Sequence, residues 1–101
     1  MTTAREKSVL KAALKILREE LRPRKILLFG SRAKGTQRKG SDFDLALDCP
    51  KPPGRKAERL EERISEKSGL FRIDLVYLPA ATKDFRDIIL STGKVVYAKG
   101  N

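Results

Sequence analysis

The sequence predicts an α+β fold, with a mixed sheet of about four strands and helices packed against it. Apolar residues recur at helical spacing in three segments, and four other short segments have the alternating or continuous apolar pattern of strands. The two kinds of segment follow one another along 101 residues. A chain of this length has room for one modest hydrophobic core, so we expect residues 1–101 to form a single domain with a single site.

The first predicted element is an amphipathic helix that ends before Pro23. Thr3 and Glu6 have the spacing of a capping box, which marks the start of a helix. The almost wholly apolar run over residues 25–29 then predicts a central strand that is buried on both faces. Four leucines recur at helical spacing in the first helix: Leu10, Leu14, Leu17 and Leu21.

Residues 31–35 predict one helical turn, and a polar loop follows as far as Ser41. From Asp42 the side chains alternate strictly, which predicts a second strand with one apolar and one mainly acidic face. The apolar face carries Phe43, Leu45 and Leu47, and the other face carries Asp42, Asp44, Ala46 and Asp48.

The remainder of the chain predicts two further helices and two further strands after a break at residues 50–54. In order, these are a helix ended by Gly69, a strand over residues 71–77 closed by Pro79, a helix capped by Thr82 and ended by Gly93, and a strand over residues 95–97.

Composition excludes several classes of site. The chain has no histidine and one cysteine, Cys49, so it can form neither a Cys/His zinc site nor a Ser-His-Asp triad. We interpret Cys49 as a small apolar residue. No secretory signal pattern and no run of 18 apolar residues is present, so we expect a cytoplasmic protein that does not enter a membrane.

The net charge of +10 favours polyanionic partners, such as nucleotides, RNA or an acidic protein face. Charge alone favours the simpler interpretation of a solvated, soluble surface. The clustering of basic residues in one loop-rich segment favours the functional interpretation: Arg32, Lys34, Arg38 and Lys39.

Asp42 and Asp44 lie two residues apart on a predicted strand, so their carboxylates face the same side with backbone positions roughly 6 to 7 Å apart. Such carboxylates repel each other unless cations lie between them, and oxygen-only ligands favour magnesium or manganese. By itself the pair is also typical of an ordinary solvent-facing strand. Gly30-Ser31 changes this balance, because it follows a buried strand and opens a helical turn whose free N–H groups favour a phosphate.

Gly30-Ser31, ten intervening residues and then Asp42-x-Asp44 resemble the signature of the polymerase-beta-like nucleotidyltransferase superfamily. Within it, residues 28–35 and 41–45 are most similar to the minimal nucleotidyltransferases, and the resemblance covers essentially the whole chain. It implies the nucleotidyltransferase fold, ATP as substrate, and two Mg²⁺ ions (or Mn²⁺) held by Asp42, Asp44 and a third carboxylate, for which Asp74 stands in the expected place. It also implies that the nucleotide is bound by Gly30, Ser31, Arg32, Lys34 and Ser41.

These relatives are commonly antitoxins paired with a helical HEPN-type toxin. The resemblance therefore implies transfer of AMP from ATP to a tyrosine of that partner by in-line displacement, with Asp42, Asp44 and Asp74 as the catalytic carboxylates. Alternatives remain open: a non-catalytic antitoxin that masks its partner, a nucleotidyltransferase acting on a small molecule, or direct RNA binding. The RNA alternative lacks an aromatic stacking platform, so we do not favour it.

Overall fold

A computed structural model describes residues 4–30, 33, 42–69 and 71–100 of the chain. Helices and strands follow one another in the predicted order through these residues. The elements are α1 (Ala4–Leu21), β1 (Lys25–Phe29), β2 (Phe43–Leu47), α3 (Lys56–Ser68), β3 (Ile73–Tyr77), the short 3₁₀ helix η1 (Leu78–Ala80), α4 (Lys83–Thr92) and β4 (Lys94–Ala98).

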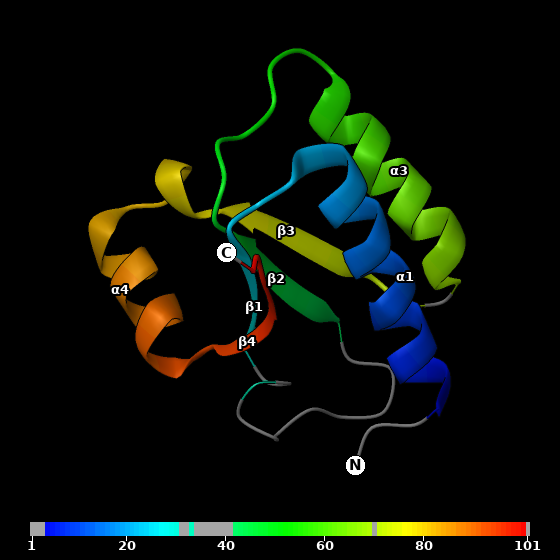
Figure 1. The fold of residues 1–101 in the computed structure, drawn as a ribbon, viewed down its shortest axis with the longest axis horizontal. Coiled ribbons are helices and arrows are strands. Elements are labelled where there is room, and N and C mark those ends of the chain that lie inside the picture. The colour runs from blue at the N-terminus through cyan, green and yellow to red at the C-terminus, as the bar shows by residue number, and fades with distance from the viewer. Residues whose placement is uncertain (1–3, 31–32, 34–41, 70, 101) are drawn as a thin grey trace.

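The four strands form one mixed sheet in the order β3-β2-β1-β4. The pairs β1·β2 and β1·β4 are antiparallel, whereas β2 and β3 are parallel. Helices α1 and α3 lie on one side of this sheet and α4 lies on the other (Figure 1). The predicted α+β class and four-strand mixed sheet are therefore confirmed, and β3 and β4 are the two edge strands.

Strand alternation divides the hydrophobic core between the two faces of the sheet. The larger cluster lies under α1 and α3 and includes Leu45 and Leu47, both 0% exposed. The smaller cluster lies under α4, where Ala46 and Leu27 pack with Ile89. The prediction that residues 25–29 form a strand covered on both faces is confirmed, because Ile26 belongs to the first cluster and Leu27 to the second.

Two helix ends, the start of α4 and the end of α3, have the local structure that the sequence predicts. The Thr82 hydroxyl accepts a hydrogen bond from the Phe85 N–H, which caps α4 as predicted. Gly69 ends α3 with φ +64, a left-handed conformation in which glycine avoids the strain of a side chain. Thr3, the expected cap of the first helix, and most of the helical turn expected at residues 31–35 lie outside the described residues.

Two details differ from the sequence prediction, namely the start of the third strand and the buried face of α1. The third strand begins at Ile73 instead of at residue 71, because the Phe71 N–H still donates to the Ser68 carbonyl in the turn after α3. In α1 the buried stripe is rotated relative to the leucine pattern. Leu17 is buried but Leu10, Leu14 and Leu21 are only partly so, and the other buried apolar residues of the helix are Val9, Ala13 and Ile16.

Candidate active site

Three aspartates lie on the sheet face that carries α4. Because Leu45 and Leu47 point into the core under α1 and α3, Asp44 points to the opposite face. Ala46, the next residue on that face, is covered by α4 and is 0% exposed. Asp44 is half-buried and Asp42 is exposed, so the acidic end of β2 extends beyond the part of the face that α4 covers.

The parallel pairing of β2 with β3 brings a third carboxylate to this place. Asp74 is the direct register partner of Asp44, and residues in register on neighbouring strands have side chains on the same face. Asp42 lies two residues before Asp44, immediately ahead of β2, and its charge also acts on Asp44. The structure thus brings Asp42, Asp44 and Asp74, the three carboxylates singled out in the sequence, to one end of two adjacent strands.

The electrostatics of the site reflect this crowding. The pKa of Asp44 is raised above its ordinary value, first because the carboxyl is partly buried, and then because the charges of Asp74 and Asp42 oppose its ionisation. A cluster of carboxylates that destabilise one another's charge has the chemistry of a site for a hard divalent cation. On donor chemistry, therefore, these residues fit the magnesium ions that the sequence implies.

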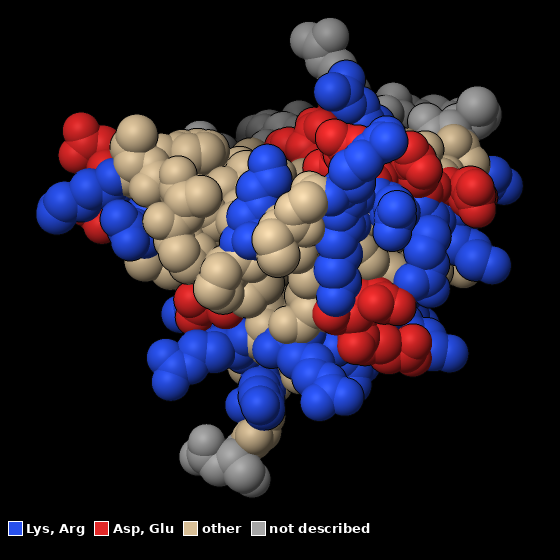
Figure 2. All heavy atoms as spheres, turned by 90° about the horizontal axis from the view of Figure 1, so that it is seen from above, with Lys and Arg blue, Asp and Glu red and all other residues tan. Residues whose placement is uncertain are grey.

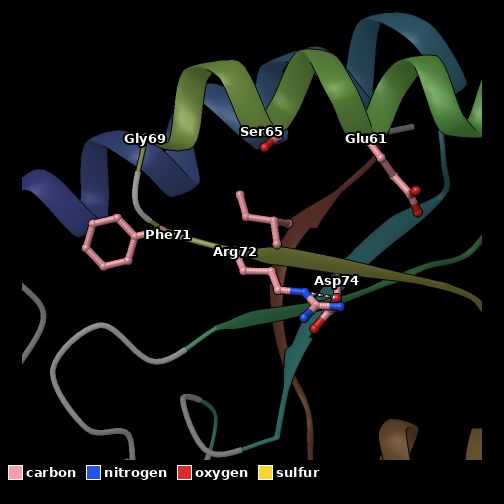
Figure 3. A pocket seen from close by; sticks show the side chains of 7 residues that line it. Glu61, Ser65, Gly69, Phe71, Arg72 and Asp74 are labelled. Carbon is pink, nitrogen blue, oxygen red and sulfur yellow. Dashed lines mark hydrogen bonds and ion pairs between the residues drawn. The ribbon is translucent and has the colours of Figure 1, made fainter.

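Asp74 has a basic neighbour, Arg72, just before its own strand. The Arg72 Nε donates a hydrogen bond to the Asp74 Oδ1 at 3.2 Å, and the two side chains are 73% and 42% exposed (Figure 3). Within the described ranges, no three His, Cys, Asp or Glu side chains converge closely enough to hold a metal ion. In this structure Asp74 turns toward Arg72. For all three carboxylates to bind metal, Asp74 would have to turn away from Arg72.

Gly30 lies against the same carboxylates. It follows β1 with φ +74, and a Cβ atom added there would lie 2.5 Å from the Asp44 Oδ2. The left-handed backbone conformation therefore favours glycine here, and a larger residue would push the Asp44 carboxylate aside. The close approach of Gly30 to Asp44 follows from the antiparallel register of β1 and β2. Phe29 is the register partner of Asp44, so Gly30, the next residue, lies beside Asp44.

The other predicted nucleotide-binding residues cannot be placed. Ser31, Arg32, Lys34 and Ser41 lie outside the described residues. In the same segment, Ala33 is helical and 8% exposed.

A cavity of about 460 Å³ adjoins Asp74 at the outer edge of β3. Figure 3 shows Glu61 and Ser65 pointing from α3 toward β3, with Asp74 on the strand and Arg72 just before it. No local pattern in the sequence marks this cavity, since its position depends on how α3 lies against an edge strand. Its lining residues are Glu61, Ser65, Gly69, Phe71, Arg72, Ile73 and Asp74.

Other titratable groups contribute little to this site. Burial, and then the charge of Asp48, raises the pKa of the Cys49 thiol, which keeps it protonated at neutral pH. Asp87 near the start of α4 pairs with Lys83 at 3.1 Å.

Figure 2, which looks at the molecule from above the view of Figure 1, shows Lys and Arg interspersed with Asp and Glu on that face rather than a continuous basic surface.

Comparisons with known proteins identify the family to which the chain belongs. The family model described as "Polymerase beta, Nucleotidyltransferase" matches residues 11–101. A curated relative from Haemophilus influenzae, named a probable protein adenylyltransferase MntA, is 40% identical over 70% of this chain and 63% of its own length. The match thus spans slightly less than two thirds of that relative. A putative protein adenylyltransferase of Methanocaldococcus jannaschii is 33% identical over 74% of this chain and 76% of its own length.

A solved structure shares the fold. A chain in a crystal structure of a toxin-antitoxin with AMP-PNP superposes with a TM-score of 0.74 at 26% identity, over 88% of this chain and 73% of that chain. In the described part of the chain, no helix is both long enough and apolar enough to cross a membrane.

Proposed function

The chain belongs to the polymerase beta nucleotidyltransferase family, and from this premise we propose that it transfers AMP from ATP to a tyrosine hydroxyl of a partner protein. The observation that carries the proposal is the register of Asp44 with Asp74 on neighbouring strands. Asp42 lies close to this pair, and Gly30 packs against Asp44. Two relatives whose names describe protein adenylyltransferases support the same activity.

Asp42, Asp44 and Asp74 are the proposed ligands of two Mg²⁺ ions, with Mn²⁺ as a possible substitute. When bound, these ions supply positive charge to the phosphate oxygens and to the attacking and leaving oxygens. The carboxylates hold that charge at the open end of the sheet face. The backbone after β1, at Gly30 and Ser31, holds the triphosphate, together with Arg32, Lys34 and Ser41 of the same segment.

In the proposed reaction the acceptor oxygen forms a bond to the α-phosphorus of ATP. The bond from the α-phosphorus to the bridging oxygen of the β-phosphate breaks, and pyrophosphate leaves. Asp74 accepts the proton of the acceptor hydroxyl, which requires that its carboxylate first leave Arg72. Exposed ion pairs of this kind contribute only about 0.2 to 1 kcal/mol, so substrate and metal binding can displace the contact.

The acceptor in this proposal is a helical HEPN-type toxin, which the chain modifies as its antitoxin in the cytoplasm. The toxin-antitoxin structure with AMP-PNP supports a toxin as the partner. The net charge of +10 also suits a partner with an acidic surface.

One observation favours a second candidate function. The described carboxylates do not converge as three ligands, and Asp74 pairs with Arg72 instead. A chain in which this arrangement persisted would bind and mask its partner without transferring AMP. The two functions differ in whether the partner gains mass.

The decisive experiment is to co-express the chain with the protein encoded beside it, add ATP and Mg²⁺, and weigh both proteins by intact-mass spectrometry. Addition of whole AMP units to the partner is the expected result. It should be absent from the Asp42→Asn/Asp44→Asn variant and present in Asp48→Asn, a matched control on the same sheet face but outside the site. A tight complex without added mass in any variant would refute transfer and leave the masking function.

A further inference from the structure

The cavity beside Asp74 raises the question of where the acceptor binds. A base must lie within hydrogen-bonding distance of the hydroxyl that it deprotonates, so the acceptor side chain has to reach Asp74. Asp74 lines the cavity between α3 and the outer edge of β3, and its volume of about 460 Å³ lies within the usual range for ligand sites.

Strand β3 offers its outer backbone edge to this cavity. It is the last strand on its side of the sheet, with β2 as its neighbour. The Phe43 N–H donates to the Arg72 carbonyl at 2.9 Å, so the backbone groups of Arg72 point toward β2. Because these groups alternate along a strand, those of Ile73 and Leu75 point away from the sheet. They are available to an added strand.

We propose that the acceptor protein binds as an extended segment along the outer edge of β3, in the groove between β3 and α3, with its hydroxyl side chain over Asp74. This inference rests on the proposed transfer of AMP and adds the place and manner of acceptor binding. Edge addition supplies affinity through backbone hydrogen bonds, and side-chain positions along the groove supply specificity.

Strand spacing explains why a tyrosine suits this position. An added strand lies one strand spacing beyond β3 and two spacings, about 10 Å, from Asp42 and Asp44 on β2. A side chain of the added strand that faces the same side as Asp74 must cross much of that distance to meet a nucleotide held at β2. A tyrosine hydroxyl extends over Asp74 toward β2, whereas a serine hydroxyl stays beside its own backbone.

The two ends of the groove suit a protein segment. Phe71 provides an aromatic surface at one end, where it also packs edge-on against Phe43 at 5.9 Å. Arg72, 73% exposed, provides a basic group at the rim. Once released from Asp74, it complements an acidic residue of the acceptor, in keeping with the strongly positive charge of the chain.

The test fills the groove without touching the carboxylates. Ser65→Trp places bulk in the groove, and Glu66→Trp places the same bulk on an exposed position of α3 that does not line it. The acceptor probe is the co-expressed protein encoded beside the chain. Ser65→Trp should raise the KM for this acceptor at least about tenfold while the dissociation constant of ATP stays that of the wild type. Glu66→Trp should match the wild type in both, and thermal unfolding checks that both variants are folded.

Photo-crosslinking from a benzophenone side chain at position 65 provides a second readout that does not require turnover. We expect crosslinks to the segment of the acceptor that contains the modified tyrosine. Normal acceptor kinetics in Ser65→Trp, or crosslinks only to a second copy of this chain, would overturn the groove assignment while transfer by the wild type still supports the proposed function. Absence of transfer by the wild type would overturn the function itself and the groove assignment with it.

Discussion

Replacing Asp44 by asparagine should stabilise the metal-free protein. Partial burial of Asp44 disfavours its charged form. Asp74 lies directly opposite on the neighbouring strand, so the two like charges also repel, and Asp42 adds to the repulsion. Asparagine has nearly the same shape and no charge. Cross-strand charge pairs contribute about 0.2 to 1 kcal/mol, which corresponds to a rise in Tm of about 1 to 8 °C for a domain of this size.

The stabilisation by Asp44→Asn should increase as the pH rises. The folded-state pKa of Asp44 is raised above the ordinary value of 3.8, so ionised Asp44 disfavours the folded state. This destabilisation is absent below pH 3.8 and complete once the pH exceeds the raised pKa. The Tm difference between Asp44→Asn and the wild type should therefore be small at pH 3, grow as the pH rises through this window, and persist at pH 7.

Thermal unfolding followed by circular dichroism, with a chelator and again with Mn²⁺, provides the measurement. Asp48→Asn is the matched control, because it removes one negative charge just beyond the opposite end of β2 without altering the cluster. Mn²⁺ should stabilise the wild type more than Asp44→Asn. A variant that is less stable than both the wild type and Asp48→Asn at pH 7 without metal would show that the three carboxylates do not repel one another as the structure implies.

Three other variants test the turn at Gly30, the ion pair of Arg72 with Asp74, and the cap of α4. Gly30→Ala should lower the free energy of unfolding by about 1 to 2 kcal/mol, because φ is +74, and should abolish AMP transfer by displacing Asp44; denaturant unfolding at wild-type midpoint would contradict this. Arg72→Gln should tighten Mn²⁺ binding in calorimetry by up to about fivefold, because it frees Asp74, and weaker binding would instead make Arg72 a support of the metal site. Thr82→Ala should cost about 1 kcal/mol of stability and leave transfer intact, with Thr82→Ser close to the wild type in the same urea titration.

Helix caps and strand faces were predictable because they depend on residues close together in sequence. The Thr82 cap involves a backbone N–H three residues away. The shared face of Asp42 and Asp44 follows from the two-residue period of any strand. The buried face of α1 was predicted less accurately. The leucine pattern shows which residues are apolar, but packing against α3 and the sheet determines which residues are fully covered.

The sequence alone determined the order of elements, the pair Asp42 and Asp44, and the need for glycine at position 30 as part of a recognisable pattern. Only the tertiary structure decided that Asp74 is the register partner of Asp44, since the same alternation in the third strand would fit any neighbour and any register. It also decided that Arg72 pairs with Asp74 and that Glu61 and Ser65 face the edge of β3. Contacts between segments distant in sequence depend on strand order and helix packing, and no local pattern of residues specifies these.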